Sequence, residues 1–96
     1  MLTREQEKFL RKEANGLPAL LQLGKGGMSE NFLKSLDDDL EAHELVKVNL
    51  LKTCDLDVKE TAADCAMAVG ADVVQAIGRT FILYRRSKEN KLGAPL

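Results

Sequence analysis

The sequence predicts an α/β fold: a two-layer sandwich in which helices cover a four-stranded mixed sheet, with elements in the order αβαβαββ. Three observations lead to this fold class. Apolar residues recur with helical spacing in three segments, and short apolar or β-branched runs alternate with those segments. A two-residue turn at Gly78 and Arg79 joins the last two runs. Ninety-six residues make one domain, which we expect over residues 1–88 and followed by a flexible tail over 89–96.

We expect a first helix from Thr3 to Asn15. Thr3 and Gln6 have the spacing of a capping box, and Gly16 is placed to end the helix. Its exposed surface is basic and carries Arg4, Lys8, Arg11 and Lys12. Such residues either solvate a helix or bind an anionic partner, and the helix alone leaves both readings open.

The next two elements are a strand over residues 17–23 and a helix from Ser29 to His43. Glycines bound the strand, and Pro18 suits its first residues. Ser29 is the expected N-cap of the helix. The run Asp37-Asp38-Asp39 lies on its exposed side.

Four elements complete the chain. A strand is expected over residues 45–51 and a helix over 58–69, with Asp57 as its N-cap and Gly70 as its stop. Two further strands are expected from Ala71 to Ile77 and from Thr80 to Arg86. Strand–helix–strand units predict right-handed crossovers and mostly parallel pairing, with the last hairpin adding an antiparallel strand.

Charge is distributed unevenly along the chain. Residues 1–34 carry a net charge of +2, residues 35–72 of −7 and residues 73–96 of +4, which gives a total of −1. We therefore expect a basic face, suited to a polyanion, opposite an acidic one. No apolar run approaches the roughly 18 residues of a membrane helix. The polar N-terminus does not resemble a targeting peptide, so we expect a cytoplasmic protein without a membrane partner.

Cysteine and histidine, the residues of most zinc sites and of many nucleophile–base pairs, are few. Cys54, Cys65 and the one histidine, His43, lack the paired spacing of a structural zinc site, so we expect no metal and reduced, buried thiols. His43 and one thiol could form a base and a nucleophile. A histidine at a helix end and thiols at core positions give that pairing little support, and we expect no enzymatic activity.

The segment Gly24-Lys25-Gly26-Gly27 joins the first strand to the second helix. Glycines allow close approach of the backbone to a ligand, and N–H groups at a helix N-terminus attract anions. The spacing fits neither the phosphate loop nor the dinucleotide-binding pattern, so we expect no nucleotide cofactor. It does fit the G-x-x-G loop that clamps a nucleic-acid backbone in KH domains. A structural turn is the alternative, and the pattern alone leaves both open.

Basic residues elsewhere extend this hypothesis to a surface. The last hairpin is basic, and Tyr84 within it is a candidate to stack on a base, although one ring makes no stacking platform. Binding should therefore be mainly electrostatic and sensitive to salt. The predicted RNA-binding residues are Gly24, Lys25, Gly26, Gly27, Arg4, Lys8, Arg11, Lys12, Arg79, Arg85 and Arg86.

Five short motifs together resemble the CRM domain, over about residues 2–88. This family includes small stand-alone bacterial YhbY-type proteins and plant organelle splicing factors. The resemblance implies a fold akin to the C-terminal domain of bacterial translation initiation factor three. It also implies RNA binding through the G-x-x-G loop and the neighbouring basic surface. The motifs are Leu23-Gly24-Lys25-Gly26-Gly27, Glu30-Asn31, His43-Glu44-Leu45-Val46-Lys47-Val48, Ile77-Gly78-Arg79 and Leu83-Tyr84-Arg85.

For single-domain bacterial members the resemblance implies association with precursors of the large ribosomal subunit and a role in ribosome maturation. The expected partner is therefore structured RNA, in particular large-subunit ribosomal RNA in precursor particles, with ribosomal proteins as further candidates. We expect a monomer. The run Asp37-Asp38-Asp39 must face away from RNA. The alternative function is a protein-interaction module that docks a basic partner on this acidic helix.

Overall fold

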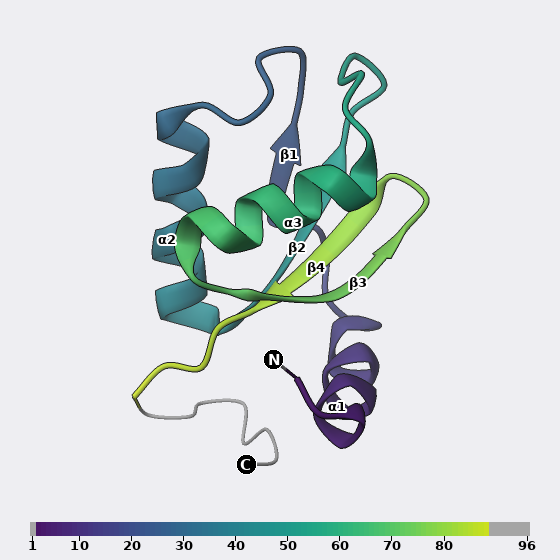
Figure 1. Ribbon diagram of the computed structural model, residues 1–96, viewed down its shortest axis with the longest axis vertical. Coiled ribbons are helices and arrows are strands. Elements are labelled where there is room, and N and C mark those ends of the chain that lie inside the picture. Colours follow the sequence, from purple (N-terminus) through teal and green to yellow (C-terminus); the bar gives the residue numbers. More distant parts are fainter. Residues whose placement is uncertain (1, 89–96) are drawn as a thin grey trace.

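A computed structural model describes residues 2–88, and its helices and strands follow the predicted order (Figure 1). The expected α/β class with a four-stranded mixed sheet is confirmed. The predicted tail over 89–96 lies outside the described residues. The elements are α1 (Arg4–Ala14), β1 (Leu21–Leu23), α2 (Glu30–His43), β2 (Leu45–Leu50), α3 (Val58–Val69), β3 (Asp72–Ile77) and β4 (Thr80–Tyr84).

Each helix begins at the N-cap that the sequence predicts. Thr3 and Gln6 form a reciprocal capping box, with bonds of 2.8 and 3.1 Å between the backbone N–H of each and the side chain of the other. The side chains of Ser29 and Asp57 accept hydrogen bonds of 3.1 and 3.0 Å from backbone N–H groups three residues further on. These bonds satisfy donors that have no acceptor within the helix. At the other end of α3, Gly70 adopts φ +67° and stops the helix, as expected.

The connection from α1 to β1 differs from the prediction. Gly16 is not among the residues with positive φ, and β1 is shorter than the expected strand over 17–23. Residues 17–20 instead carry the chain from α1 to the edge of the sheet. They are held by a bond of 3.0 Å from Leu20 N to Lys47 O and one of 3.0 Å from Lys47 Nζ to Leu17 O. Pro18 has no N–H with which to extend the strand ladder.

The strand order is β1-β2-β4-β3, with one parallel pair, β1 with β2. The prediction of mostly parallel pairing is wrong, because β4 turns back at Gly78 and inserts between β2 and β3. The crossover through α3 therefore skips one strand position, and β2 and β3 are not neighbours. A register shift between Val73 and Gln75 bends β3 where it pairs with β4.

Side chains alternate between two faces of the sheet, and each face has its own core. The α2/α3 face is covered by α2 and α3, and the α1 face is covered in part by α1 (Figure 1). The larger core lies on the α2/α3 face and comprises Leu23, Leu36, Leu40, Val46, Val48, Leu50, Cys54, Ala62, Cys65, Ala66, Phe81 and Leu83. The smaller core lies beneath α1 and comprises Leu10, Ala14, Leu45, Val74, Ile82 and Tyr84.

Both thiols are free and buried in the larger core, as predicted. Burial, with a smaller contribution from the Asp64 carboxylate, raises the pKa of Cys65 from 9.0 to about 11. The thiol therefore stays protonated at neutral pH and is a weak nucleophile. Its Sγ lies 3.1 Å from Met28 Sδ, which ties α3 to the segment that follows the glycine loop. None of the helices over residues 2–88 is long and apolar enough to cross a membrane.

Candidate nucleic-acid interface

Residues Gly24 to Gly27 form a tight turn between β1 and α2, which we call the glycine turn. The N–H of Gly27 donates to the carbonyl oxygen of Gly24 at 3.1 Å, and Lys25 and Gly26 are its exposed central residues. Gly27 has φ +62°, a conformation that residues with a Cβ rarely adopt. Within residues 2–88, neither a hydrogen bond nor an ion pair holds the Lys25 ammonium. The turn therefore presents bare backbone and one mobile cation to solvent.

α2 begins at Glu30, and Met28 and Ser29 join it to this turn. Its N-cap Ser29 uses the N–H of Phe32, whereas the N–H groups of Glu30 and Asn31 lie at positions where a helix offers no acceptor of its own. Those donors and the helix dipole favour an anion here. The Glu30 carboxylate in the first turn of α2 opposes that preference. The site is therefore built from backbone donors and Lys25 more than from accumulated positive charge.

The glycine turn packs against the loop between β2 and α3. A Cβ at Gly24 would lie 3.6 Å from Leu51 Cδ1, and a Cβ at Gly27 would lie 3.4 Å from Leu56 Cδ1. A Cβ at Gly26 would meet no heavy atom within 4 Å. The structure thus demands glycine at position 27, while position 26 is open to a ligand.

Arg79 holds the β2–α3 loop in place. Its Nε donates to the carbonyl of Leu50 at 3.0 Å, and its Nη2 donates to the carbonyls of Leu51 and Cys54, the latter at 2.8 Å. The N–H of Leu50 donates in turn to the Arg79 carbonyl at 2.6 Å. Arg79 therefore shapes the loop on which the glycine turn rests, and its guanidinium is committed to protein carbonyls.

The guanidinium of Arg85, at the other end of β4, is also hydrogen-bonded within the protein. Its Nη1 donates to Asp37 Oδ1 at 2.6 Å and to the Val69 carbonyl at 2.8 Å. Its Nη2 donates to the Asp37 carbonyl at 3.0 Å and to Glu41 Oε2 at 3.3 Å. Arg85 thus clamps the end of β4 to α2 and α3, and its side chain is only 21% exposed.

The predicted RNA-binding residues fall into two groups at opposite ends of the molecule (Figure 1). The loop end carries the glycine turn and Arg79, because β1 and β3 finish there and β4 starts there. The α1 end carries α1, the start of β2 and the end of β4. The structure therefore does not gather the predicted cations around the glycine turn. The residues of the α1 end are Arg4, Lys8, Arg11, Lys12, Arg85 and Arg86.

The basic residues of α1 are all exposed. Arg11 makes an ion pair of 3.6 Å with Glu7 one turn earlier. At the end of β4, Arg86 Nε donates to Tyr84 Oη at 3.3 Å. Tyr84 itself is 4% exposed beneath α1, so its ring is not available to stack on a base.

Glu44 is a structural residue that the sequence does not reveal. Its side chain is fully buried, its φ is +67°, and its carboxylate accepts hydrogen bonds from the N–H of Ser87, at 2.7 Å, and from the Ser87 hydroxyl. The carbonyl of Glu44 also accepts from the N–H of Arg85 at 2.9 Å. Glutamate is rarely buried, and no motif marks this one. It fixes the course of the chain beyond β4.

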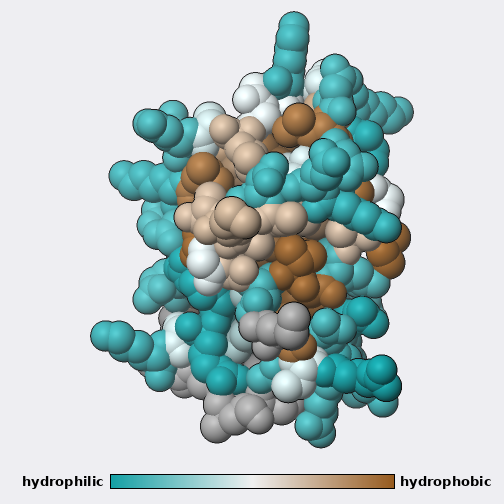
Figure 2. All heavy atoms as spheres, in the orientation of Figure 1, coloured by the Kyte–Doolittle hydropathy of each residue, from teal (hydrophilic) through white to brown (hydrophobic). Residues whose placement is uncertain are grey.

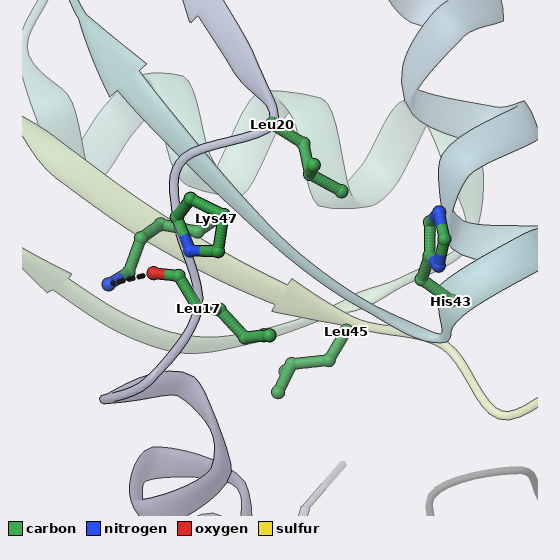
Figure 3. Close-up of a pocket in the computed structure, with 6 residues that line it drawn as sticks. Leu17, Leu20, His43, Leu45 and Lys47 are labelled. Atoms are coloured by element: carbon green, nitrogen blue, oxygen red, sulfur yellow. Dashed lines mark hydrogen bonds between the residues drawn. The ribbon is translucent and has the colours of Figure 1, made fainter.

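His43 lies apart from both thiols. It lines an apolar cavity of about 290 Å³ between the α1–β1 connection, the end of α2 and β2, whereas the thiols lie in the core beneath α2 and α3 (Figure 3). No hydrogen bond joins His43 to either thiol within residues 2–88. Over the same residues, no three His, Cys, Asp or Glu side chains gather as a metal site requires.

Comparison with known proteins gives consistent matches. Residues 2–85 match the model of the CRS1/YhbY (CRM) domain. The Bacillus subtilis protein named "Probable RNA-binding protein YqeI" is 43% identical over 91 residues, which cover 95% of each chain. A Haemophilus influenzae protein named "RNA-binding protein" is 33% identical over 95 residues, which cover 98% of this chain and 95% of the other.

A solved structure matches the fold over its full length. It is the solution structure of the Staphylococcus aureus hypothetical protein SAV1595, which is described as a candidate RNA-binding protein. The TM-score is 0.83 at 43% sequence identity, and the match covers 100% of this chain and 99% of the other.

Proposed function

The chain belongs to the CRS1/YhbY (CRM) domain family, and we propose that it binds RNA by holding the backbone at the glycine turn. Its relatives named as RNA-binding proteins support RNA as the ligand. One observation carries the assignment to the turn: an exposed Lys25, without a partner among residues 2–88, lies between glycines in the turn that precedes α2 and its N-cap Ser29. That combination suits a phosphate group.

The chemistry of the turn favours backbone over bases. A phosphate oxygen accepts hydrogen bonds from the exposed N–H groups, and Lys25 adds a point charge on a flexible stem that imposes no base preference. The open space at Gly26 lets a sugar-phosphate backbone approach closely. The turn therefore fixes where RNA is held and contributes no choice of sequence.

We propose further that the RNA is ribosomal, in precursors of the large subunit, and that the protein assists their maturation in the cytoplasm as a monomer. This part rests on the family resemblance, which implies such a role for single-domain bacterial members, and this chain spans 95% of a relative of that size. The action we propose is binding without catalysis. In support, the Cys65 thiol is protonated and buried, and His43 lies apart from it.

The alternative, docking of a basic protein on α2, has weaker support. Figure 2 shows hydrophilic side chains along the α2 side of this view and a paler, more apolar band over α3. However, Arg85 already pairs with Asp37 and Glu41, which removes part of the charge that a basic partner would contact.

Binding of a structured ribosomal RNA fragment tests the role of the turn. The double variant Lys25→Ala with Gly26→Asp removes the cation and places a carboxylate in the open position, so we expect affinity to fall at least about tenfold. The matched control, Lys34→Ala with Ser35→Asp, also removes one cation and adds one carboxylate, but at exposed positions of α2. Circular dichroism establishes that both variants fold. A folded turn variant that binds as tightly as its control would refute the assignment.

Crosslinking in cells, followed by sequencing of the attached RNA, tests the ribosomal part. We expect the crosslinks to concentrate in large-subunit ribosomal RNA and to include precursor sequences that mature ribosomes lack. Crosslinks spread over messenger RNA in proportion to its abundance would contradict the ribosomal part and leave RNA binding intact.

A further inference from the structure

α1 leaves most of two rows of side chains uncovered on its face of the sheet, and Ile82 is the member of these rows that is buried in the core beneath α1. Residues paired across strands point to the same face, and the paired Leu45 and Tyr84 lie beneath α1. Two rows closer to the loop end, which we call the open rows, point the same way. The first row is Gln22, Asn49, Thr80 and Ile77, and the second is Lys47, Ile82 and Gln75.

The open rows carry hydrogen-bonding groups and no carboxylate. Asn49 and Thr80 are joined by a side-chain bond of 3.2 Å, Gln22 is exposed, and Ile77 is 64% exposed. Five members of the open rows, together with Asn15, line a hollow of about 250 Å³ at the C-terminal end of α1. Its lining is Asn15, Lys47, Gln75, Ile77, Thr80 and Ile82.

The open rows lie between the two separated groups of predicted RNA-binding residues. At the loop end, Gln22 stands two residues before the glycine turn, and Ile77 leads directly into the turn that contains Arg79. At the other side the hollow starts at Asn15, which follows the last helical turn of α1 with its Arg11 and Lys12. The open rows are therefore the surface that lies between the residues of the loop end and the basic residues of α1.

Charge on the remainder of the molecule favours this path for a polyanion. Among residues 2–88, the carboxylates of the α1 face belong to α1 itself (Glu5, Glu7 and Glu13) and to Asp72, which pairs with the covered Tyr84. The other side of the sheet is strongly acidic. Its helices carry Glu30 at the loop end and, further along, Asp37, Asp38, Asp39, Glu41, Glu60 and Asp64.

We propose that the open rows bind an unpaired RNA segment whose backbone is held at the glycine turn, an inference that rests on the proposed function. The Watson–Crick edges of bases are accessible to side chains only where nucleotides are unpaired. The amides of Gln22, Asn49 and Gln75 offer donors and acceptors to those edges, and Ile77 offers an apolar contact. No aromatic side chain stands in the open rows, so recognition is by hydrogen bonding rather than by stacking. The rows supply the base preference that the glycine turn lacks.

Added charge on the open rows gives the first test, with single-stranded RNA 12-mers of random sequence as the probe. Gln22→Glu with Gln75→Glu changes shape little and places two carboxylates beneath the RNA, so we expect affinity to fall at least about tenfold. Ser35→Glu with Met67→Glu is the matched control, since it adds the same charge at exposed positions of α2 and α3. We expect this control to bind within about twofold of the parent. Equal affinity of both variants for the 12-mers would show that RNA does not contact the open rows, and would overturn the proposal.

An uncharged variant gives the second test and separates base contacts from electrostatics. Sequencing of the 12-mers retained by the parent should show enrichment of particular bases, and Gln22→Ala with Gln75→Ala should flatten that enrichment. Its slope of log affinity against log salt should stay the same, because amides contact no phosphate. A parent without base preference would overturn the assignment of the rows to base edges.

The outcomes distinguish this inference from the proposed function. If the parent binds the 12-mers and a structured fragment no better than an unrelated acidic protein does, both fail. If Lys25→Ala weakens binding and the open-row variants do not, the glycine turn stands and the open rows are refuted. If only the open-row variants weaken binding, the rows stand and the turn assignment fails.

Discussion

Single residues in the glycine turn have different roles, although the sequence gives them the same letter. Gly27 carries the positive φ and lies against Leu56, Gly24 packs near Leu51, and Gly26 faces open space. Sequence reasoning identified the turn and its exposed lysine but not this division. A positive φ depends on where α2 begins, and the neighbouring leucines come from a distant segment. Sequence reasoning also missed the roles of Arg79 and Arg85. The spacing of an arginine in the sequence does not show whether its guanidinium binds protein carbonyls or is exposed to a ligand.

Alanine substitution at the two neighbouring glycines tests this division. Gly27→Ala forces a Cβ into the left-handed region and toward Leu56, so we expect a loss of about 1–2 kcal/mol in the free energy of unfolding. Gly26→Ala meets nothing within 4 Å and has no positive φ, so its loss should stay within about 0.5 kcal/mol. Urea unfolding of both variants measures the difference, and equal losses would show that the turn does not require glycine at position 27.

At the scale of elements, helices were more predictable from sequence than strands. Thr3, Ser29 and Asp57 mark helix starts through local hydrogen bonds, which a local pattern captures. Strand pairing depends on contacts between distant segments. The insertion of β4 between β2 and β3 leaves no local signature, and neither does the passage of residues 17–20 from one face to the edge of the sheet. The wrong expectation of mostly parallel pairing follows from that difference.

Arg79 joins two elements, and its replacement should affect both. Arg79→Ala removes a charged donor from the carbonyls of Leu50, Leu51 and Cys54, so we expect a loss of about 1.5–3 kcal/mol in unfolding free energy. The β2–α3 loop and the glycine turn should both exchange their amide hydrogens faster. Urea unfolding and hydrogen exchange provide the measurements, with Arg4→Ala on exposed α1 as the control.

Arg79→Lys separates this positioning role from direct contact with RNA. A lysine retains the charge but cannot place planar donors on three carbonyls. We therefore expect the lysine and alanine variants to have the same rates of amide hydrogen exchange and the same affinity for RNA. Near-parental RNA affinity of the lysine variant, with the loop still loosened, would instead indicate that residue 79 acts as a charge on phosphate.

For the whole molecule, the position of charge matters more than its total. The net charge of −1 conceals an acidic α2/α3 side and a sheet face whose open rows carry no carboxylate. Solvent-exposed charges separated by more than about 8–10 Å interact weakly at physiological salt. RNA on the α1 face should therefore respond to Lys25 and Lys47 and little to the acidic residues of α2. A protein with a slightly negative net charge can therefore bind a polyanion when its acidic residues lie away from the binding surface.

Salt dependence of RNA binding tests this account directly. Removal of one cation that neutralises a phosphate should reduce the slope of log affinity against log salt by about 0.7 for single-stranded RNA, so Lys25→Ala should flatten the slope by that amount.

Asp38→Asn with Asp39→Asn raises the net charge from −1 to +1 on the opposite side of the sheet, and we expect the slope to stay unchanged. The slope counts ions released at contacted phosphates, and net charge does not enter it. Titrations at several salt concentrations measure both slopes. A steeper slope for the asparagine variant would show that RNA reaches α2, and that the acidic helix borders the binding surface rather than lying behind it.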